Sequence, residues 1–243
     1  MANQKVALIT GANKGIGFET ARQLGAKNIL VIIGARDAHK GEAAAETLRK
    51  QGINAHSIVI DVTNQKSIDA AAAKVTKELG QLDILVNNAG VMLEDPEKQN
   101  SVAGLDVWRQ TFETNVFGLI ATTEAFLPLL RKSPAGRIVN LSSILGSIAY
   151  QATPGSPTYG FSRPSYNVSK AAVNAYTVQL AYQLKDTNIK VNAAHPGWVK
   201  TDMGGEGATM EIEDGAKTSV ALATIGKDGP NGAYLHMGEP IPW

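Results

Sequence analysis

Short runs of β-branched and aliphatic residues alternate with longer helical patterns, and this alternation limits the possible folds more than any other feature of the chain. Runs that are apolar on both faces are typical of strands buried inside a parallel sheet. Because a helical pattern follows nearly every run, we predict an α/β fold with a doubly wound parallel sheet flanked by helices. The runs lie at 6–9, 29–33, 56–60, 84–86, 137–141 and 190–194, and the helical patterns at about 16–26, 38–51, 64–79, 104–131 and 165–184.

Composition narrows the class of protein. With 243 residues, 44% of them hydrophobic, the chain can form one large domain over residues 1–243. Lys and Arg total 23 against 22 Asp and Glu, which gives no indication of a nucleic-acid partner. The lack of cysteine excludes disulfides and thiolate chemistry. No apolar run approaches the ~20 residues of a membrane span, and the first residues lack the order of a signal peptide. We therefore expect a cytoplasmic protein with no membrane partner.

A glycine-rich turn joins the first strand to the first helix. Gly11, Gly15 and Gly17 allow a tight turn and a close approach of the backbone to a ligand. The helix N-terminus that follows offers free N–H groups and a partial positive charge to a pyrophosphate. The spacing is G-x-x-x-G-x-G, and a plain tight connection is the alternative. The strand before the turn and the helix after it favour a nucleotide site.

The end of the second strand indicates which dinucleotide binds. A free ribose 2′-hydroxyl is usually met there by Asp or Glu, whereas a 2′-phosphate requires cations. Arg36 and Lys40 follow this strand, and Lys14 lies in the glycine turn. We therefore predict NADP(H) as the cofactor. Asp37 is interpreted as the N-cap of the next helix and not as a ribose ligand.

Tyr166 and Lys170 stand four residues apart in a helical pattern, so they share one face of the helix. A nearby ammonium favours phenolate over phenol, and a shift of the Tyr166 pKa from about 10 toward 7 needs ~4 kcal/mol. Such a phenol is a candidate general acid. The spacing also occurs by chance in helices, so the pair needs support from the rest of the chain.

Five motifs in the same order as the strands supply that support. Together they resemble the short-chain dehydrogenase/reductase family, over nearly the full chain. Details near the C-terminus are most similar to its NADPH-dependent carbonyl reductases: Thr201-Asp202-Met203, residues 213–218, residues 229–232 and Trp243. The resemblance implies a single-domain Rossmann-type sheet that reduces a ketone or aldehyde with NADPH. The five motifs are the glycine turn, Asn87-Asn88-Ala89-Gly90, Ser142-Ser143, Tyr166 with Lys170, and residues 196–201.

The resemblance also implies a catalytic set. Tyr166 would donate a proton to the carbonyl oxygen, and Ser143 would hydrogen-bond the developing oxyanion. Lys170 would bind the nicotinamide ribose and lower the Tyr166 pKa, while Asn115 would hold a water that links Lys170 to solvent. No metal is required, because the cofactor carries the redox chemistry. The cofactor contacts implied in addition to Tyr166 and Lys170 are Gly11, Asn13, Lys14, Gly15, Ile16, Gly17, Arg36, Lys40, Asp61, Val62, Asn88, Ala89, Gly90, Pro196, Gly197, Val199 and Thr201.

Other residues compete for these roles. Tyr159 is followed by Arg163 at the same spacing, but a guanidinium does not replace the lysine, and Pro164 disfavours a helix through Arg163. Ser142 is the rival of Ser143, and the family pattern favours the second serine. His195 invites a catalytic interpretation, yet a histidine that packs or hydrogen-bonds at a strand end is the more ordinary one.

The distance from Ser143 to Tyr166 departs from the family pattern. It is twenty-three residues, where the family commonly has about a dozen, and the extra residues fall in 148–165. We expect the loops near 91–96, 145–165 and 203–213 to shape the pocket for a small carbonyl substrate, and the chain to be a monomer or a homo-oligomer. Two alternatives stay open, a 3-oxoacyl-thioester reductase and a non-catalytic NADP-binding regulatory protein.

Overall fold

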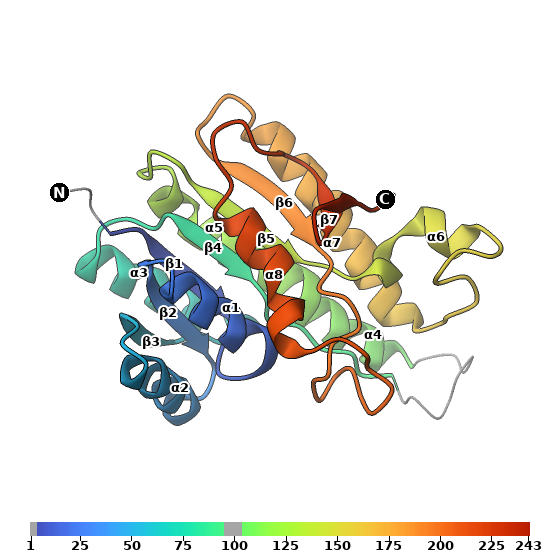
Figure 1. Cartoon of the computed structure of the whole chain (residues 1–243), viewed down its shortest axis with the longest axis horizontal. Helices are drawn as coiled ribbons and strands as arrows, with labels where there is room; N and C mark the ends of the chain where they lie inside the picture. The colour runs from blue at the N-terminus through green and yellow to red at the C-terminus, as the bar shows by residue number, and fades with distance from the viewer. Residues whose placement is uncertain (1–3, 95–103) are drawn as a thin grey trace.

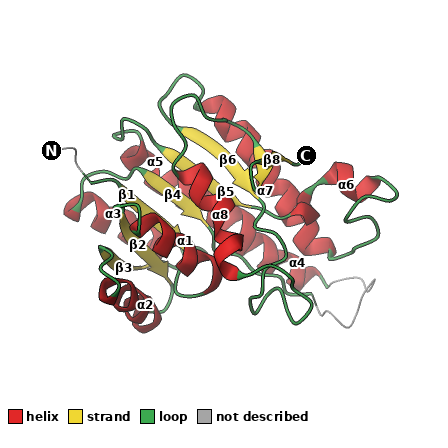
Figure 2. Ribbon diagram, in the orientation of Figure 1, coloured by secondary structure: helices red, strands yellow, loops and turns green. Residues whose placement is uncertain are grey.

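The central sheet runs in the order β3-β2-β1-β4-β5-β6-β7-β8, and helices cover both of its faces (Figures 1 and 2). The computed structural model describes residues 4–94 and 104–243. All neighbouring strands pair in parallel except β7 and β8. The strands are β1 (Val6–Thr10), β2 (Leu30–Ala35), β3 (Ala55–Val59), β4 (Ile84–Asn87), β5 (Arg137–Leu141), β6 (Lys190–Ala194), β7 (Tyr234–His236) and β8 (Glu239–Pro240).

The helices form two layers. The predicted doubly wound sheet is confirmed, with the first six strands close to their expected positions. The layer on one face holds α1 (Gly15–Gly25), α2 (Ala38–Lys50) and α8 (Ile212–Ala223). The layer on the other holds α3 (Gln65–Glu78), α5 (Gly118–Leu130) and α7 (Pro164–Gln183). Shorter elements are α4 (Leu105–Phe112), a π-helical turn (Glu113–Phe117), a 3₁₀ turn (Ile144–Gly146) and α6 (Ile148–Ala152).

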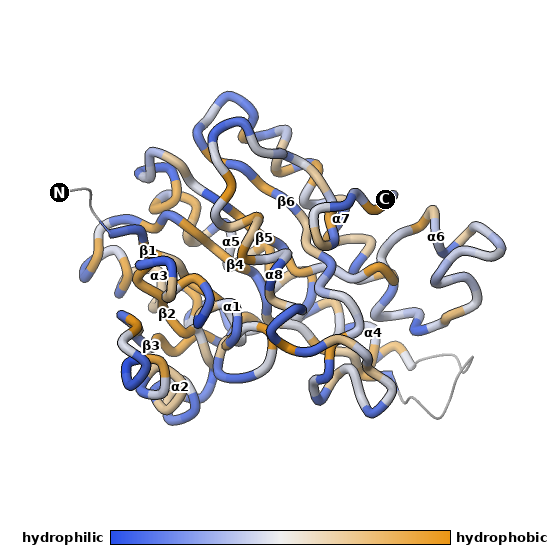
Figure 3. The backbone as a smooth tube through the Cα atoms, viewed as in Figure 1, coloured by the Kyte–Doolittle hydropathy of each residue, from blue (hydrophilic) through white to orange (hydrophobic). Residues whose placement is uncertain are grey.

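The core consists of two hydrophobic clusters separated by the sheet. In β1, Ala7 and Ile9 belong to the cluster beneath α1, α2 and α8, whereas Val6 and Leu8 belong to the cluster beneath α3, α5 and α7. This division follows from the alternation of side chains along a strand. Each fully buried Val, Leu or Ile contributes about 1.5–3 kcal/mol. Figure 3 shows the hydrophobic residues gathered on the central strands and the hydrophilic ones on the outer loops.

The strand order reverses at β1, which pairs with β2 on one side and with β4 on the other. The chain segments that follow β1 and β4 lead away in opposite directions. A crevice therefore opens between them at the carboxyl ends of these two strands. Ligands of open α/β sheets bind in such a crevice. The glycine turn after β1 and the residues after β4 lie here.

The predicted helix over 104–131 is wrong in one respect, because a π-helical turn divides it into α4 and α5. Tight packing accompanies the break: a Cβ added to Gly118, the first residue of α5, would lie 2.6 Å from Val62 O. The sequence patterns also did not predict α8 or α6. Among the described residues, no helix is both long and apolar enough to cross a membrane.

Candidate active site

The glycine turn forms a cradle that side chains would fill. Gly11 and Gly15 have φ angles of +62° and +59°, a region that favours glycine. A Cβ on Gly17 would lie 2.5 Å from Asn88 Nδ2 and 2.8 Å from Gly11 O. Helix α1 begins at Gly15 with no side-chain cap and no acidic residue in its first turn. Its N–H groups therefore face the cradle without a partner from a cap, which suits a pyrophosphate.

Thr10 and Asn88 hold this turn in place. The Asn88 side-chain amide donates to Thr10 O at 2.8 Å and to Gly11 O at 3.2 Å. Thr10 Oγ1 accepts from the backbone N–H groups of Asn88 and Ala89, both at 3.0 Å. Both amide hydrogens of Asn88 are thus committed to shaping the cradle. Sequence reasoning missed Thr10, although a polar residue at a strand end just before the glycine turn is a usable signal.

Cations lie where a 2′-phosphate is expected. Arg36 and Lys40 are exposed beyond β2, and neither forms an ion pair within residues 4–94 and 104–243. Asp37 caps α2, since its carboxylate accepts from Lys40 N at 3.0 Å, and this lowers the Asp37 pKa. The interpretation of Asp37 as an N-cap is confirmed. Lys14 differs from the other two cations, because its ammonium forms an ion pair with Asp202, on the loop after β6.

The remaining expected cofactor residues line the same edge of the sheet. Asp61 forms a turn after β3, where its carboxylate accepts from Thr63 N at 2.9 Å. Thr201 approaches the cradle, with its methyl group 3.6 Å from the Cβ position of Gly15. Gly197 adopts φ +92° in the turn after β6. Partly buried residues complete the set: Asn13, Ile16, Val62, Ala89, Gly90 and Pro196, with Val199 fully buried.

Tyr166, Lys170 and Ser143 converge beside the crevice. Tyr166 and Lys170 lie one turn apart on α7, and Lys170 Nζ is 5.6 Å from the centre of the Tyr166 ring. Ser143 follows β5, and its side chain lies near enough to the Tyr166 phenol to lower the Tyr166 pKa. Lys170 Nζ donates to Leu141 O at 2.8 Å, which ties the lysine to the last residue of β5. The three side chains are 8%, 5% and 9% exposed, so their interactions operate largely away from water.

Burial is the main cause of the pKa shifts of Tyr166 and Lys170. It raises the pKa of Tyr166 to about 12; the side chain of Ser143 acts in the opposite direction and the charge of Glu94 adds to the rise. The expected fall of the Tyr166 pKa toward 7 is therefore wrong for this structure, because desolvation of the phenolate outweighs stabilisation by neighbours. Burial also lowers the pKa of Lys170 to about 8.

Asn115 lies in the π-helical turn and connects two segments of the site. Its Oδ1 accepts from Val91 N at 2.8 Å, and its Nδ2 donates to Val91 O at 2.9 Å and to Ser169 Oγ at 3.0 Å. Gly90 lies between Asn115 and Lys170: its Cβ position is 3.3 Å from Asn115 Oδ1 and 3.6 Å from Lys170 Nζ. The structure thus brings Asn115 and Lys170 to the same place.

The competing residues have other partners or positions. Ser142 Oγ is buried against α7, where it donates to Asn174 Oδ1 at 2.6 Å. Tyr159 is 55% exposed on the segment before α7. Ser143 and Tyr166 therefore lie together, whereas Ser142 and Tyr159 take no part in that contact.

Glu94 is a residue of this site that sequence reasoning missed. Its Oε1 accepts from Ser165 Oγ at 2.6 Å and from Tyr166 N at 3.0 Å. Arg163, the N-cap residue of α7, makes no side-chain capping bond, and Glu94 caps this helix from another loop. Residues 95 and 96 of the expected substrate loop at 91–96 lie outside the described residues. No signal in the sequence links Glu94 to α7.

The segment between Ser143 and Tyr166 packs against the C-terminal residues. Ser147 Oγ donates to Pro242 O at 2.6 Å, and Ala149 N donates to Trp243 O at 2.9 Å. The rings of Tyr234 and Trp243 are stacked with their centres 5.3 Å apart. In Figure 1, α6 extends from the edge of the molecule that carries the C-terminus.

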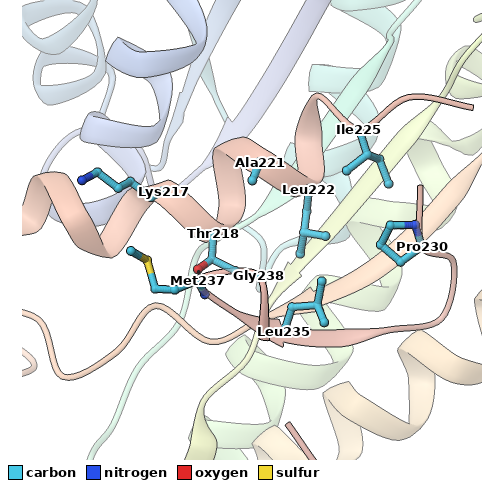
Figure 4. A pocket seen from close by; sticks show the side chains of 9 residues that line it. All are labelled: Lys217, Thr218, Ala221, Leu222, Ile225, Pro230, Leu235, Met237 and Gly238. Atoms are coloured by element: carbon cyan, nitrogen blue, oxygen red, sulfur yellow. Dashed lines mark hydrogen bonds between the residues drawn. The ribbon is translucent and has the colours of Figure 1, made fainter. Parts of the chain in front are cut away.

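A separate cavity of about 380 Å³ lies between α8 and β7 (Figure 4). Its walls are mainly apolar and include Leu222, Ile225 and Leu235. The polar groups at its edge are already paired: Thr218 Oγ1 accepts from Met237 N at 2.9 Å, and Lys217 forms an ion pair with Asp214. None of the candidate catalytic residues is among the described residues that line this cavity.

A known protein family accounts for most of the chain. The family model described as short chain dehydrogenase matches residues 5–211. The chain belongs to the short-chain dehydrogenase family. The resemblance inferred from the five motifs is thereby confirmed, and the residues that carry it are those that meet at the crevice.

Members of the short-chain dehydrogenase family from several organisms are similar along the whole chain. The short-chain dehydrogenase anuI of Penicillium roqueforti (strain FM164) is 41% identical over 230 residues, covering 91% of this chain and 89% of that protein. Carbonyl reductase (NADPH) 1 of Mus musculus is 33% identical, covering 100% of this chain and 99% of that protein. The crystal structure of NADPH-bound carbonyl reductase from chicken fatty liver has a TM-score of 0.85 and 30% identity, covering 99% and 100% of the two chains.

Proposed function

We propose that this protein reduces the carbonyl group of a ketone or aldehyde to an alcohol, with NADPH as the reductant and Tyr166 as the general acid. The buried contact between Ser143 and Tyr166, with Lys170 beside the phenol ring, carries this proposal. This group lies at the edge of the sheet that also holds the glycine cradle. Relatives with matching folds are named as NADPH carbonyl reductases.

The residues at the crevice suit NADPH. The glycine cradle and the uncapped N-terminus of α1 would hold the pyrophosphate, and Arg36 and Lys40 would hold the 2′-phosphate. Thr201 and Gly197, on the loop after β6, would contact the nicotinamide end. When bound, NADPH supplies the hydride that adds to the carbonyl carbon.

Proton transfer belongs to Tyr166. The carbonyl oxygen gains negative charge as its carbon is reduced, and Tyr166 Oη donates the proton that completes the alcohol. A pKa of about 12 keeps this phenol protonated throughout the neutral range. An alkoxide oxygen is far more basic than a phenolate, so the transfer is favourable even from such a weak acid. Ser143 Oγ donates a hydrogen bond to the same oxygen and holds it near the phenol.

Lys170 and Asn115 serve the return of the proton. The ammonium of Lys170 lies beside the phenol ring, and its pKa of about 8 allows it to exchange protons near neutral pH. Its hydrogen bond to Leu141 O fixes the position of Nζ for the ribose hydroxyls. Asn115, adjacent to Gly90 and Ser169, would hold the water that connects Lys170 to solvent.

A 3-oxoacyl-thioester reductase is the second candidate. One observation favours it: a variant of actinorhodin polyketide ketoreductase, solved with NADPH, has a TM-score of 0.82 and 28% identity, covering 98% of this chain and 97% of that one. Both candidates use the same catalytic group and differ in the substrate loops near 145–165 and 203–213. A substrate panel separates them.

The test is NADPH oxidation measured with aldehydes, ketones, diketones, quinones and a 3-oxoacyl thioester, with Tyr166→Phe as the matched control. We expect turnover of at least one class of simple carbonyl and its loss in the control. Turnover of the thioester alone would favour the second candidate. Tight NADPH binding without turnover of any carbonyl would overturn the proposal in favour of a regulatory protein.

A further inference from the structure

His195 occupies a junction between two loops of the site. It directly follows β6 and is 8% exposed. Its ring nitrogen Nδ1 accepts from Ile144 N at 3.2 Å and from Gly197 N at 3.3 Å. One side-chain atom therefore satisfies two backbone N–H groups from segments more than fifty residues apart in the sequence.

Each of these N–H groups belongs to a loop that carries a functional residue. Ile144 follows Ser143 and begins the 3₁₀ turn after β5. Gly197 belongs to the turn after β6, which leads to Thr201 beside the glycine cradle. The ring of His195 thus connects the loop that contacts the carbonyl oxygen with the loop proposed to contact the nicotinamide.

The two hydrogen bonds define the state of the ring. An imidazole nitrogen that accepts must be unprotonated, so His195 carries its proton on Nε2 and is neutral. Burial, and then the neighbouring His236 ring at 4.8 Å, lower the His195 pKa to about 3. The backbone is fixed as well, because His195 N donates to Leu235 O and His236 Nδ1 lies 2.9 Å from His195 O. The junction is therefore stable across the neutral range.

We propose that His195 is a positioning residue, whose Nδ1 acceptor sets the separation between Ser143 and the nicotinamide-binding turn at Gly197. This inference rests on the proposed reductase function. It predicts that the histidine acts on the hydride-transfer step and not on the affinity for NADPH, because the proposed phosphate-binding residues lie in the turn between β1 and α1 and in the segment from the end of β2 into α2. A misplacement of about 1 Å between the reacting atoms can slow such a step by on the order of 10²-fold.

Two substitutions at His195 distinguish the effect of the acceptor atom from the effect of the volume of the ring. In His195→Asn the amide Oδ1 takes the place of Nδ1, whereas His195→Leu keeps the volume and leaves both N–H groups without an acceptor. We expect the leucine variant to lose kcat by on the order of ten- to a hundredfold, and the asparagine variant to stay within about threefold. His236→Asn is the control, because it removes the adjacent ring while its amide can still donate to His195 O, and it leaves the His195 Nδ1 bonds in place.

The readouts distinguish positioning from a loss of stability. NADPH dissociation constants should stay within a few fold for all variants, and the isotope effect with deuterated NADPH should rise in His195→Leu as hydride transfer becomes rate-limiting. If the leucine variant does not fold, His195→Gln replaces it, since its acceptor is placed at the Nε2 position and cannot reach the two N–H groups. The proposal would be overturned if kcat fell equally in His195→Asn and in the variant that lacks the acceptor, His195→Leu or its replacement His195→Gln. It would also be overturned if kcat were unchanged in the variant that lacks the acceptor.

A further measurement is independent of turnover. Nitrogen-15 NMR of the wild-type imidazole rings should show His195 with Nδ1 unprotonated and Nε2 protonated from pH 5 to 9. A proton on Nδ1 would contradict the inference even if the enzyme is active. Inactivity of the wild-type protein on every carbonyl, with the expected tautomer present, would instead count against the proposed function alone.

Discussion

Lys170 Nζ lies 5.6 Å from the centre of the Tyr166 ring, while its hydrogen bond goes to Leu141 O. The strand β5 therefore fixes the ammonium beside the phenol. Because water is excluded, the cation is costly to keep, and the Lys170 pKa is lowered to about 8. The proposed catalytic role needs the Lys170 proton, whereas the stability of the folded protein is reduced by it.

Carbonyl reduction should decline as the pH rises through about 8, because Lys170 loses the charge that binds the ribose and exchanges the proton. Tyr166, with a pKa of about 12, stays protonated in this range and does not cause the decline. The pH profile of kcat/KM measures the effect. A profile that is flat from pH 7 to 9.5 would show that Lys170 is not needed as a cation.

The stability of the wild-type protein should rise between pH 8 and 9.5. In this window the unfolded chain keeps the Lys170 proton, since the free pKa is about 10.4, whereas the folded protein has released it. The unfolded state then binds more protons, so the free energy of unfolding increases with pH, by up to about 2 kcal/mol. Denaturant titrations of wild type and Lys170→Met should differ by this slope. An equal slope in both would place the titration at another group.

Tyr166→Phe should keep the fold and the affinity for NADPH but reduce kcat by on the order of 10²- to 10⁴-fold, the usual contribution of a general acid. Tyr159→Phe is the matched control, because Tyr159 is exposed and is the rival phenol. Steady-state kinetics of both variants decide the assignment. Loss of turnover in the control with near-normal turnover in Tyr166→Phe would reverse it.

Arg36→Asp should raise the KM for NADPH by roughly tenfold or more and narrow the preference over NADH, because it replaces a cation beside the 2′-phosphate with a repelling carboxylate. Arg131→Asp makes the same change of charge at the end of α5, before β5, and should have little effect. Comparable use of NADPH and NADH by the wild-type protein would defeat the assignment of Arg36 and Lys40.

Glu94→Gln should lower the pKa of Tyr166. Burial is the main cause of the raised pKa, and the carboxylate of Glu94 adds to it. Glutamine keeps an oxygen that can accept from Ser165 Oγ and Tyr166 N, so α7 should remain capped while the charge is removed. The phenolate absorbance of this variant, compared with that of Tyr166→Phe, measures the shift. An unchanged titration would show that the charge of Glu94 does not reach the phenol.

The sequence predicted the parts of the fold that depend on local pattern. The apolar runs gave the first six strands because burial on both faces leaves an unbroken hydrophobic signature. Helix α8 was missed because Gly215 and the polar residues near Lys217 obscure its period. The resemblance to the short-chain dehydrogenase/reductase family, which the motifs carry, predicted that Ser143, Tyr166 and Lys170 would lie together.

Contacts between distant segments were beyond such prediction. Asn115 bonds Val91, twenty-four residues away, and Glu94 bonds Ser165, seventy-one residues away. Neither contact produces a periodic pattern in the sequence. The predicted Tyr166 pKa was wrong for a related reason, since the burial of the phenol depends on the packed structure and raises the pKa more than the side chain of Ser143 lowers it.

The π-helical turn at Glu113–Phe117 also fixes the angular phase between α4 and α5. An inserted residue rotates every later side chain by about 100° relative to an unbroken α-helix. On one side of the turn Thr111 meets Ser165, and on the other Phe126 and Leu130 are fully buried in the core. Thr111 on one side of the turn and Phe126 and Leu130 on the other all face inward only because the turn supplies this rotation. This segment should therefore tolerate no change of length, because the loss of a single residue would turn one of the two faces outward.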